Sequence, residues 1–200
     1  MLLPVLFLLL PIAPATFPVW GHDQNAAQKV QGAERREVQI PIKDFTLTDQ
    51  AGRPFRFQSL RGKVAIVAFA YTTCPDVCPL ITAAMRQVQD GLQGEERRRT
   101  FLLTVTTDPE IDTPAVLAAY ARRYGVELGT WAFLTGDAAS LSKVWQNFGV
   151  GVKRLARGLI DHTSLTAVID PSGTMRFAYV GSSPDAKMIL RDVRGLLHGR

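Results

Sequence analysis

The sequence predicts an α/β domain in which buried strands alternate with helices. Val64–Ala70 is a continuous apolar run of strand length, and Thr100–Thr107 is a second one. The segment between them repeats apolar residues at helical spacing. Strands joined by a helix usually become parallel neighbours through a right-handed crossover, so both runs are expected in one sheet.

A β-hairpin is expected before the first buried strand. The segment 38–57 alternates apolar and polar residues on both sides of a turn that contains Gly52. After Val64–Ala70, a helix is expected to start at about Cys78 or slightly earlier. Its buried stripe consists of Ile81, Ala84, Met85, Val88 and Leu92.

The second half of the chain continues the alternation. Thr113-Pro114 is typical of a helix start, with a capping side chain followed by proline, and Gly125 predicts the helix end. A strand is expected at 131–136. The next predicted helix has the stripe Leu141, Val144, Trp145 and Phe148.

The last elements are a hairpin and a helix. Two apolar segments, 165–170 and 174–180, flank the turn Pro171-Ser172-Gly173, and a helix is expected after Ser183-Pro184. The whole order predicts a thioredoxin-like fold: a central sheet with flanking helices and an N-terminal β-hairpin extension. Chemistry in open α/β sheets collects at the carboxyl ends of strands, which is where Cys74 and Cys78 lie.

The first 36 residues are unlike this domain. Residues 1–21 carry no charged side chain and open with an apolar run, which predicts a signal peptide or an N-terminal membrane anchor. Residues 22–36 are polar and are expected to be a linker, and 37–200 form one domain. Either leader places the domain outside the cytoplasm: in a bacterium, in the periplasm or on the periplasmic face of the inner membrane.

The net charge of +5 does not indicate a nucleic-acid partner. The densest basic run, Arg97–Arg99, follows Glu95-Glu96 and has no interleaved aromatic residues, which is typical of a solvated helix end.

The two cysteines are the only thiols of the chain and stand four positions apart. Cysteines at this spacing near a helix turn lie about 6 Å apart at Cα. That separation permits a disulfide and equally permits both sulfurs to bind one metal ion. A helix N-terminus at Cys78 would favour thiolate. Spacing alone does not choose between the two chemistries.

His162 is the candidate third ligand. His22 lies in the linker and His198 near the end of the chain, whereas His162 precedes the strand 165–170, whose start should face the cysteine loop. Asp161 is expected to orient the imidazole as a hydrogen-bond partner of the ring. Two thiolates and one imidazole suit copper, and Cu(I) is stable with three ligands.

A closed zinc site would need a fourth donor, for which only Asp108 or Asp112 is at hand. Both belong to the acidic loop 108–114. Asp112 and Thr113 are expected to cap the following helix, and Asp108 to lie near the metal site.

Four motifs together resemble the SCO/SenC family of copper proteins: YTTCPDVCP (71–79), TVTTDPEIDTPAVL (104–117), WAFLTG (131–136) and DHTSLTAVIDPSG (161–173). The resemblance covers about residues 38–198. It implies a thioredoxin-like fold and copper bound through Cys74, Cys78 and His162. It also implies a role in assembling the binuclear copper centre of cytochrome c oxidase.

Three functions are compatible with a thiol pair at this place in the fold. The first is a copper metallochaperone, not an enzyme, that delivers copper to oxidase subunit II and exchanges it with another periplasmic copper carrier. The alternative is a thiol–disulfide reductase that keeps the oxidase copper-site cysteines reduced and is recharged by a thiol reductant. A peroxidase is not indicated, because Tyr71 stands where peroxiredoxins have threonine and no proline occurs between Val64 and Tyr71. In either remaining role a redox-active Cys74–Cys78 disulfide is expected.

Overall fold

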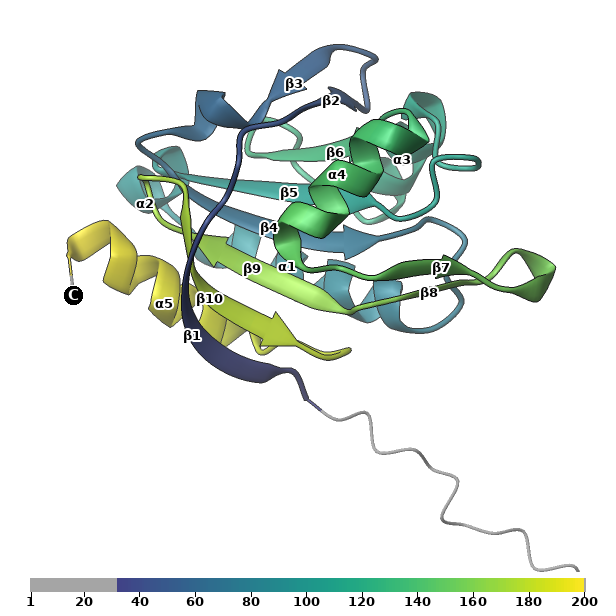
Figure 1. Cartoon of the computed structure of the whole chain (residues 1–200). Helices are drawn as coiled ribbons and strands as arrows, with labels where there is room; N and C mark the ends of the chain where they lie inside the picture. The colour runs from purple at the N-terminus through teal and green to yellow at the C-terminus, as the bar shows by residue number, and fades with distance from the viewer. Residues whose placement is uncertain (1–31, 200) are drawn as a thin grey trace, which may run out of the picture.

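A computed structural model describes residues 32–199, in which helices cover both faces of an eight-stranded sheet (Figure 1). The predicted leader, residues 1–21, and most of the predicted linker lie outside this range. The sheet order is β1-β10-β9-β4-β5-β6-β2-β3. Its strands are β1 (Glu34–Pro41), β2 (Thr46–Asp49), β3 (Pro54–Arg56), β4 (Val64–Ala70), β5 (Thr100–Thr106), β6 (Trp131–Thr135), β9 (Leu165–Ile169) and β10 (Thr174–Val180).

A separate two-stranded sheet pairs β7 (Val152–Arg154) with β8 (Ile160–His162). The helices are α1 (Val77–Gly91), α2 (Gly94–Arg98), α3 (Pro114–Arg123), α4 (Ala138–Phe148) and α5 (Ala186–His198).

β4 is the centre of the domain and is buried at all seven positions. It runs parallel to β5 on one side and antiparallel to β9 on the other. Because side chains alternate along a strand, Val64, Ile66 and Ala68 face one core and Ala65, Val67 and Phe69 face the other. Burial on both faces explains why this strand is an unbroken apolar run.

The two cores show which helices cover each face. Buried residues of α1, α3 and α5 share one core, and those of α4 share the other with β2. The predicted α/β order is confirmed, including the closing hairpin β9–β10. Of the hairpin expected over 38–57, only β2–β3 forms, because residues 38–41 belong to β1 and pair with β10.

Two predicted boundaries were wrong. β1 begins at Glu34, so the last three residues assigned to the linker belong to a strand that pairs with β10. These three residues are all charged and therefore show no apolar alternation typical of a strand. In the structure Arg35 forms an ion pair with Asp192, and Arg36 forms one with Glu34. The last helix begins at Ala186, where the Asp185 carboxylate accepts the Lys187 N–H, and not directly after Ser183-Pro184.

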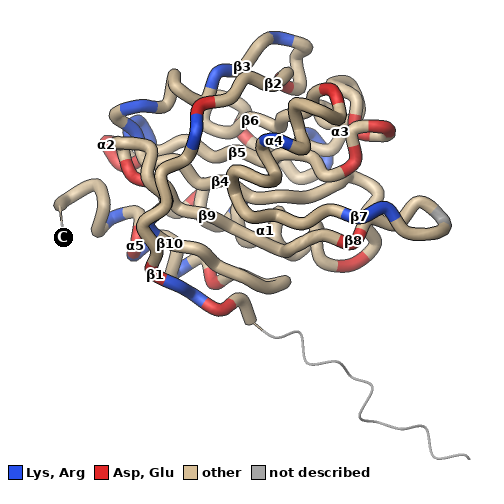
Figure 2. Tube along the Cα trace, in the orientation of Figure 1, with Lys and Arg blue, Asp and Glu red and all other residues tan. Residues whose placement is uncertain are grey.

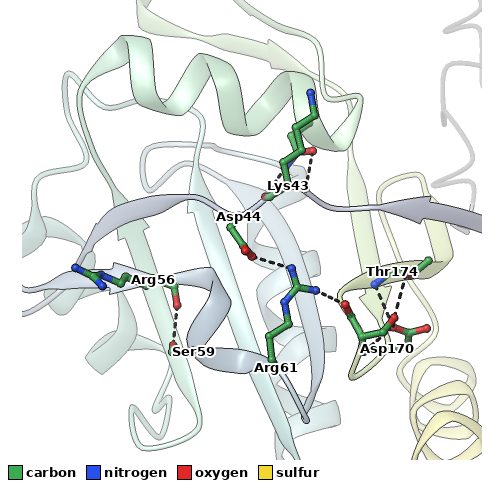
Figure 3. Close-up of polar contacts among 9 residues, drawn as sticks. Lys43, Asp44, Arg56, Ser59, Arg61, Asp170 and Thr174 are labelled. Carbon is green, nitrogen blue, oxygen red and sulfur yellow. Dashed lines mark hydrogen bonds and ion pairs between the residues drawn. The ribbon is translucent and has the colours of Figure 1, made fainter.

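The end of the sheet opposite the cysteines is closed by polar contacts (Figure 3). Arg61, just before β4, donates to Asp44 at 2.8 Å and to the Ser172 carbonyl oxygen. In the same turn, the Asp170 carboxylate accepts the Thr174 N–H at 3.0 Å. Gly173 suits this turn because its φ of 87° is one that residues with a side chain rarely adopt. Within residues 32–199, every helix is too short or too polar to cross a membrane.

Candidate metal centre

The cysteine loop joins the carboxyl end of β4 to α1. The loop turns tightly after Ala70, with the Cys74 N–H donating to the Tyr71 carbonyl oxygen at 3.3 Å. Cys78 lies in the first turn of α1 and is fully buried, whereas Cys74 is half-buried. Both are free thiols. The predicted place of the pair, at the hand-over from strand to helix, is therefore confirmed.

The sulfur of Cys74 occupies the position of a helix-capping group. Asp76, the N-cap residue of α1, makes no capping bond with its side chain, and the Cys78 N–H donates instead to Cys74 Sγ at 3.4 Å. A hydrogen bond from the Cys78 thiol and the N–H groups of the first turn together lower the pKa of Cys74 to about 5. Cys74 is therefore a thiolate at neutral pH.

Cys78 has the opposite character. Its hydrogen bond to Cys74 and its burial both raise the pKa of the Cys78 thiol. The pair thus presents one half-buried thiolate and one fully buried thiol that keeps its proton.

His162, the last residue of β8, lies beside this pair. Its Nε2 is 3.9 Å from Cys78 Sγ, and its Nδ1 is 3.1 Å from the Thr163 carbonyl oxygen. A carbonyl oxygen can only accept, so Nδ1 carries the proton in this contact and Nε2 keeps its lone pair. Burial lowers the pKa of His162, which keeps the imidazole neutral at pH 7. The nitrogen facing the sulfur is therefore available as a ligand.

Asp161 does not orient the imidazole, contrary to the sequence-based expectation. The Thr163 carbonyl oxygen takes that place, and Asp161 is exposed. Neighbouring residues on a strand point to opposite faces, which carries the Asp161 carboxylate away from the ring. It acts on His162 only through its charge.

Asp112 supports the cysteine loop and does not cap α3 as predicted. The predicted cap at Thr113 is confirmed, since its hydroxyl accepts the Val116 N–H. The buried Asp112 carboxylate accepts both the N–H and the hydroxyl of Thr72, and also the Thr106 hydroxyl. Burial raises the pKa of Asp112. Asp112 thereby fixes the backbone two residues before Cys74.

Asp108 is fully buried and is held by Arg154 of β7. Arg154 also lies 3.2 Å from the exposed Glu110. Figure 2 shows the basic residues of β7 beside the acidic part of β8. Through Arg154, Asp108 is thus linked to the strand pair that carries His162.

Two of these donors already stand at a separation that fits two ligands of one metal ion. Metal–ligand bonds of about 2.0 Å to nitrogen and 2.3 Å to sulfur place two ligands roughly 3.5–4 Å apart. The separation of Cys78 Sγ from His162 Nε2, 3.9 Å, agrees with this geometry. Among residues 32–199 no three His, Cys, Asp or Glu side chains already form a metal-binding cluster. The donors must therefore draw together to bind an ion.

Sequence reasoning missed the strand pair β7–β8 and the two side chains that fasten it, Arg154 and Tyr71. The Tyr71 hydroxyl accepts the Ile160 N–H at 3.3 Å, and its ring meets the His162 ring edge-on. The signal was present but weak. Val150 and Val152 alternate with glycines, and Gly158 precedes Leu159 and Ile160, as in a short hairpin.

Comparisons with known proteins bear on the family and on the fold. The SCO1/SenC family model matches residues 33–198. The chain is 30% identical over 159 residues to a SCO2-like protein of Rickettsia felis, covering 76% of this chain and 75% of the relative.

Solved structures of Sco proteins have a similar fold. A SCO1/SenC family lipoprotein from Bacillus anthracis has a TM-score of 0.74 at 28% identity, over 81% of this chain and 98% of the other. Copper-bound ScoI of Bradyrhizobium japonicum has a TM-score of 0.67 at 28% identity, over 78% and 99%. The predicted thioredoxin-like fold is confirmed.

Proposed function

The chain belongs to the SCO1/SenC family, and from this premise we propose that it is a copper metallochaperone with Cys74, Cys78 and His162 as ligands. In this role it delivers copper to the binuclear copper site of cytochrome c oxidase subunit II. It is then an assembly factor and not an enzyme.

One observation carries the proposal: the neutral Nε2 of His162 lies 3.9 Å from Cys78 Sγ, beside a second sulfur that is already ionised. Two sulfurs and one imidazole form a soft donor set that suits copper. Copper bound to the related ScoI of Bradyrhizobium japonicum supports the choice of metal.

The three ligands have different tasks. Cys74 offers an accessible thiolate at the surface, where an ion arrives and leaves. Cys78 must release its proton before it can bind, because only the thiolate is a metal ligand. His162 contributes a neutral nitrogen that needs no deprotonation. Copper is the cargo, and it passes from these three ligands to the ligands of a partner protein.

A second function, thiol–disulfide reduction, is favoured by the asymmetry of the two thiols. The Cys74 thiolate can attack a target disulfide and form a mixed disulfide with it. Cys78, on losing its proton, then attacks Cys74 Sγ, and the target leaves as a dithiol. The product is a Cys74–Cys78 disulfide, which a separate thiol reductant must reduce. The two functions are compatible, because copper binding also requires reduced cysteines.

The proposed location is outside the cytoplasm, in the periplasm or on the periplasmic face of the inner membrane. The uncharged apolar leader, residues 1–21, supports export. Besides subunit II, the proposed partners are another periplasmic copper carrier and a thiol reductant.

The variant His162→Ala separates the two functions. A carrier needs the imidazole, whereas disulfide exchange needs only the sulfurs. His162→Ala should weaken Cu(II) binding strongly and leave disulfide exchange near the normal rate. In cells it should abolish oxidase activity at low copper, with partial recovery when copper is raised. His198→Ala, which changes an exposed histidine at the end of α5, is the matched control. Full oxidase assembly by His162→Ala at limiting copper would overturn the carrier function and favour the reductase.

A further inference from the structure

His162 is carried on an arm outside the main sheet. The arm consists of β7, β8 and the turn between them, residues 152–162, and its two strands pair only with each other. Figure 1 shows it projecting beyond the body of the domain. An isolated two-stranded hairpin is marginally stable in water. The position of His162 therefore depends on the contacts that fasten the arm to the domain.

The first fastening lies at Ile160. Its side chain packs with Ala70, Tyr71 and Cys78 in a small buried cluster. Its N–H donates to the Tyr71 hydroxyl at 3.3 Å. These contacts hold the inner side of β8 against the cysteine loop.

The second fastening is the ion pair of Arg154 with Asp108. Arg154 stands opposite Ile160 in the β7–β8 ladder and donates to Asp108 Oδ1. The Asp108 residue is 0% exposed, and its Oδ2 has no hydrogen-bond partner among the described residues. A buried carboxylate is costly unless it is paired, so Asp108 strongly favours keeping the guanidinium in place.

The acidic loop that receives Arg154 also holds the sulfur side of the site. Asp112 accepts the Thr72 N–H at 3.2 Å, two residues before Cys74. The Asp112 N–H in turn donates to the Asp108 carbonyl oxygen at 2.9 Å. One short loop thus positions both the cysteine loop, through Asp112, and the arm, through Asp108.

The Arg154 side of the ion pair is accessible to solvent. The Arg154 side chain is 38% exposed, and the neighbouring Glu110 carboxylate is 72% exposed. Glu110 therefore offers the guanidinium a solvated partner when it leaves Asp108. The sulfurs stand on the β4–α1 connection, whose backbone is held by Asp112 and not by Arg154.

We propose that Arg154 and Asp108 form a latch that sets the position of His162 relative to Cys74 and Cys78. Arg154 is thus a positioning residue of the metal centre. When the latch opens, the imidazole withdraws with the arm while both sulfurs stay in place. The site then changes from three donors to two without unfolding of the domain. That the bound ion is copper rests on the function proposed above.

The test uses the full chain, reduced and free of metal, with Arg154→Gln compared with Lys153→Gln. Lys153 is exposed and lies on the same strand, so its replacement removes the same charge without touching the latch. Amide hydrogen exchange at Ile160 should accelerate roughly ten- to hundredfold in Arg154→Gln, the range expected for losing a hydrogen bond to a charged group. Exchange at Leu155, whose N–H donates to the Leu159 carbonyl oxygen inside the arm, should change much less. Arg154→Lys should restore part of the protection.

A merely structural role would give a different pattern. If Arg154 only stabilised the domain, amides of the central strand β4 would accelerate together with Ile160. The latch also predicts that Arg154→Gln weakens Cu(II) binding more than Cu(I) binding. Equal exchange at Ile160 in Arg154→Gln and Lys153→Gln would overturn the latch. Failure of the wild-type protein to bind copper would overturn the proposed function instead, and the exchange result would still decide the latch.

Discussion

Tyr71→Phe removes a single hydroxyl and keeps the ring, so it tests the hydrogen bond of the first fastening; the same hydroxyl also interacts with Cys74. The hydroxyl accepts the N–H of Ile160, which is only 7% exposed. Leaving a buried N–H without a partner costs about 1–3 kcal/mol. The contact is 3.3 Å long, which favours the lower half of this range. For a domain of this size, each kcal/mol lowers Tm by about 2–4 °C.

The loss is measured by urea unfolding and calorimetry of the reduced, metal-free protein, with amide exchange at Ile160 as the local probe. Tyr124→Phe is the matched control, because Tyr124 is half-buried against the core of α1, α3 and α5 and its hydroxyl accepts no backbone N–H in the described part of the chain. An unchanged free energy of unfolding together with unchanged exchange at Ile160 would refute the assigned contact.

Three further predictions follow from the cysteine loop. Asp112→Asn should lower the free energy of unfolding by about 1.5–3 kcal/mol in urea titrations, because charge-assisted bonds from Thr72 and Thr106 are lost. An unchanged free energy of unfolding would show that the carboxylate is already protonated or does not stabilise the cysteine loop. Alkylation of Cys74 by iodoacetamide should be constant at neutral pH and slow as pH falls through about 5, since the thiolate is the nucleophile. A midpoint near the ordinary thiol value of about 8.5 would contradict the lowered pKa. Oxidation should form the Cys74–Cys78 disulfide and abolish copper binding, measured as copper per chain; equal loading of oxidised and reduced protein would disprove this.

The core strands and the cysteine loop could be predicted because their signals are local. β4 is buried on both faces, so its sequence is apolar throughout, and α1 shows a regular apolar stripe. The cap at Thr113 is likewise encoded by neighbouring residues. The position of His162 near the sulfurs followed from the expected topology and agrees with the observed 3.9 Å contact with Cys78.

The support of the site could not be predicted because it depends on partners far apart in the sequence. Arg154 and Asp108 are 46 residues apart, and Tyr71 and Ile160 are 89 residues apart. The strands of the arm have three residues each, too few for a clear alternation. Asp112 looked like a helix cap because it stands beside Thr113, and only the tertiary structure shows that Thr72 is its partner.

The central claim is that Cys74, Cys78 and His162 together bind copper, and X-ray absorption of the copper-loaded protein tests it most directly. The wild-type protein should show two sulfur neighbours at about 2.3 Å and one nitrogen neighbour at about 2.0 Å, by analogy with other metal sites. His162→Ala should lose the nitrogen and keep both sulfurs, and His198→Ala should match the wild type. A copper environment without sulfur, or one that His162→Ala leaves unchanged, would contradict the proposed centre.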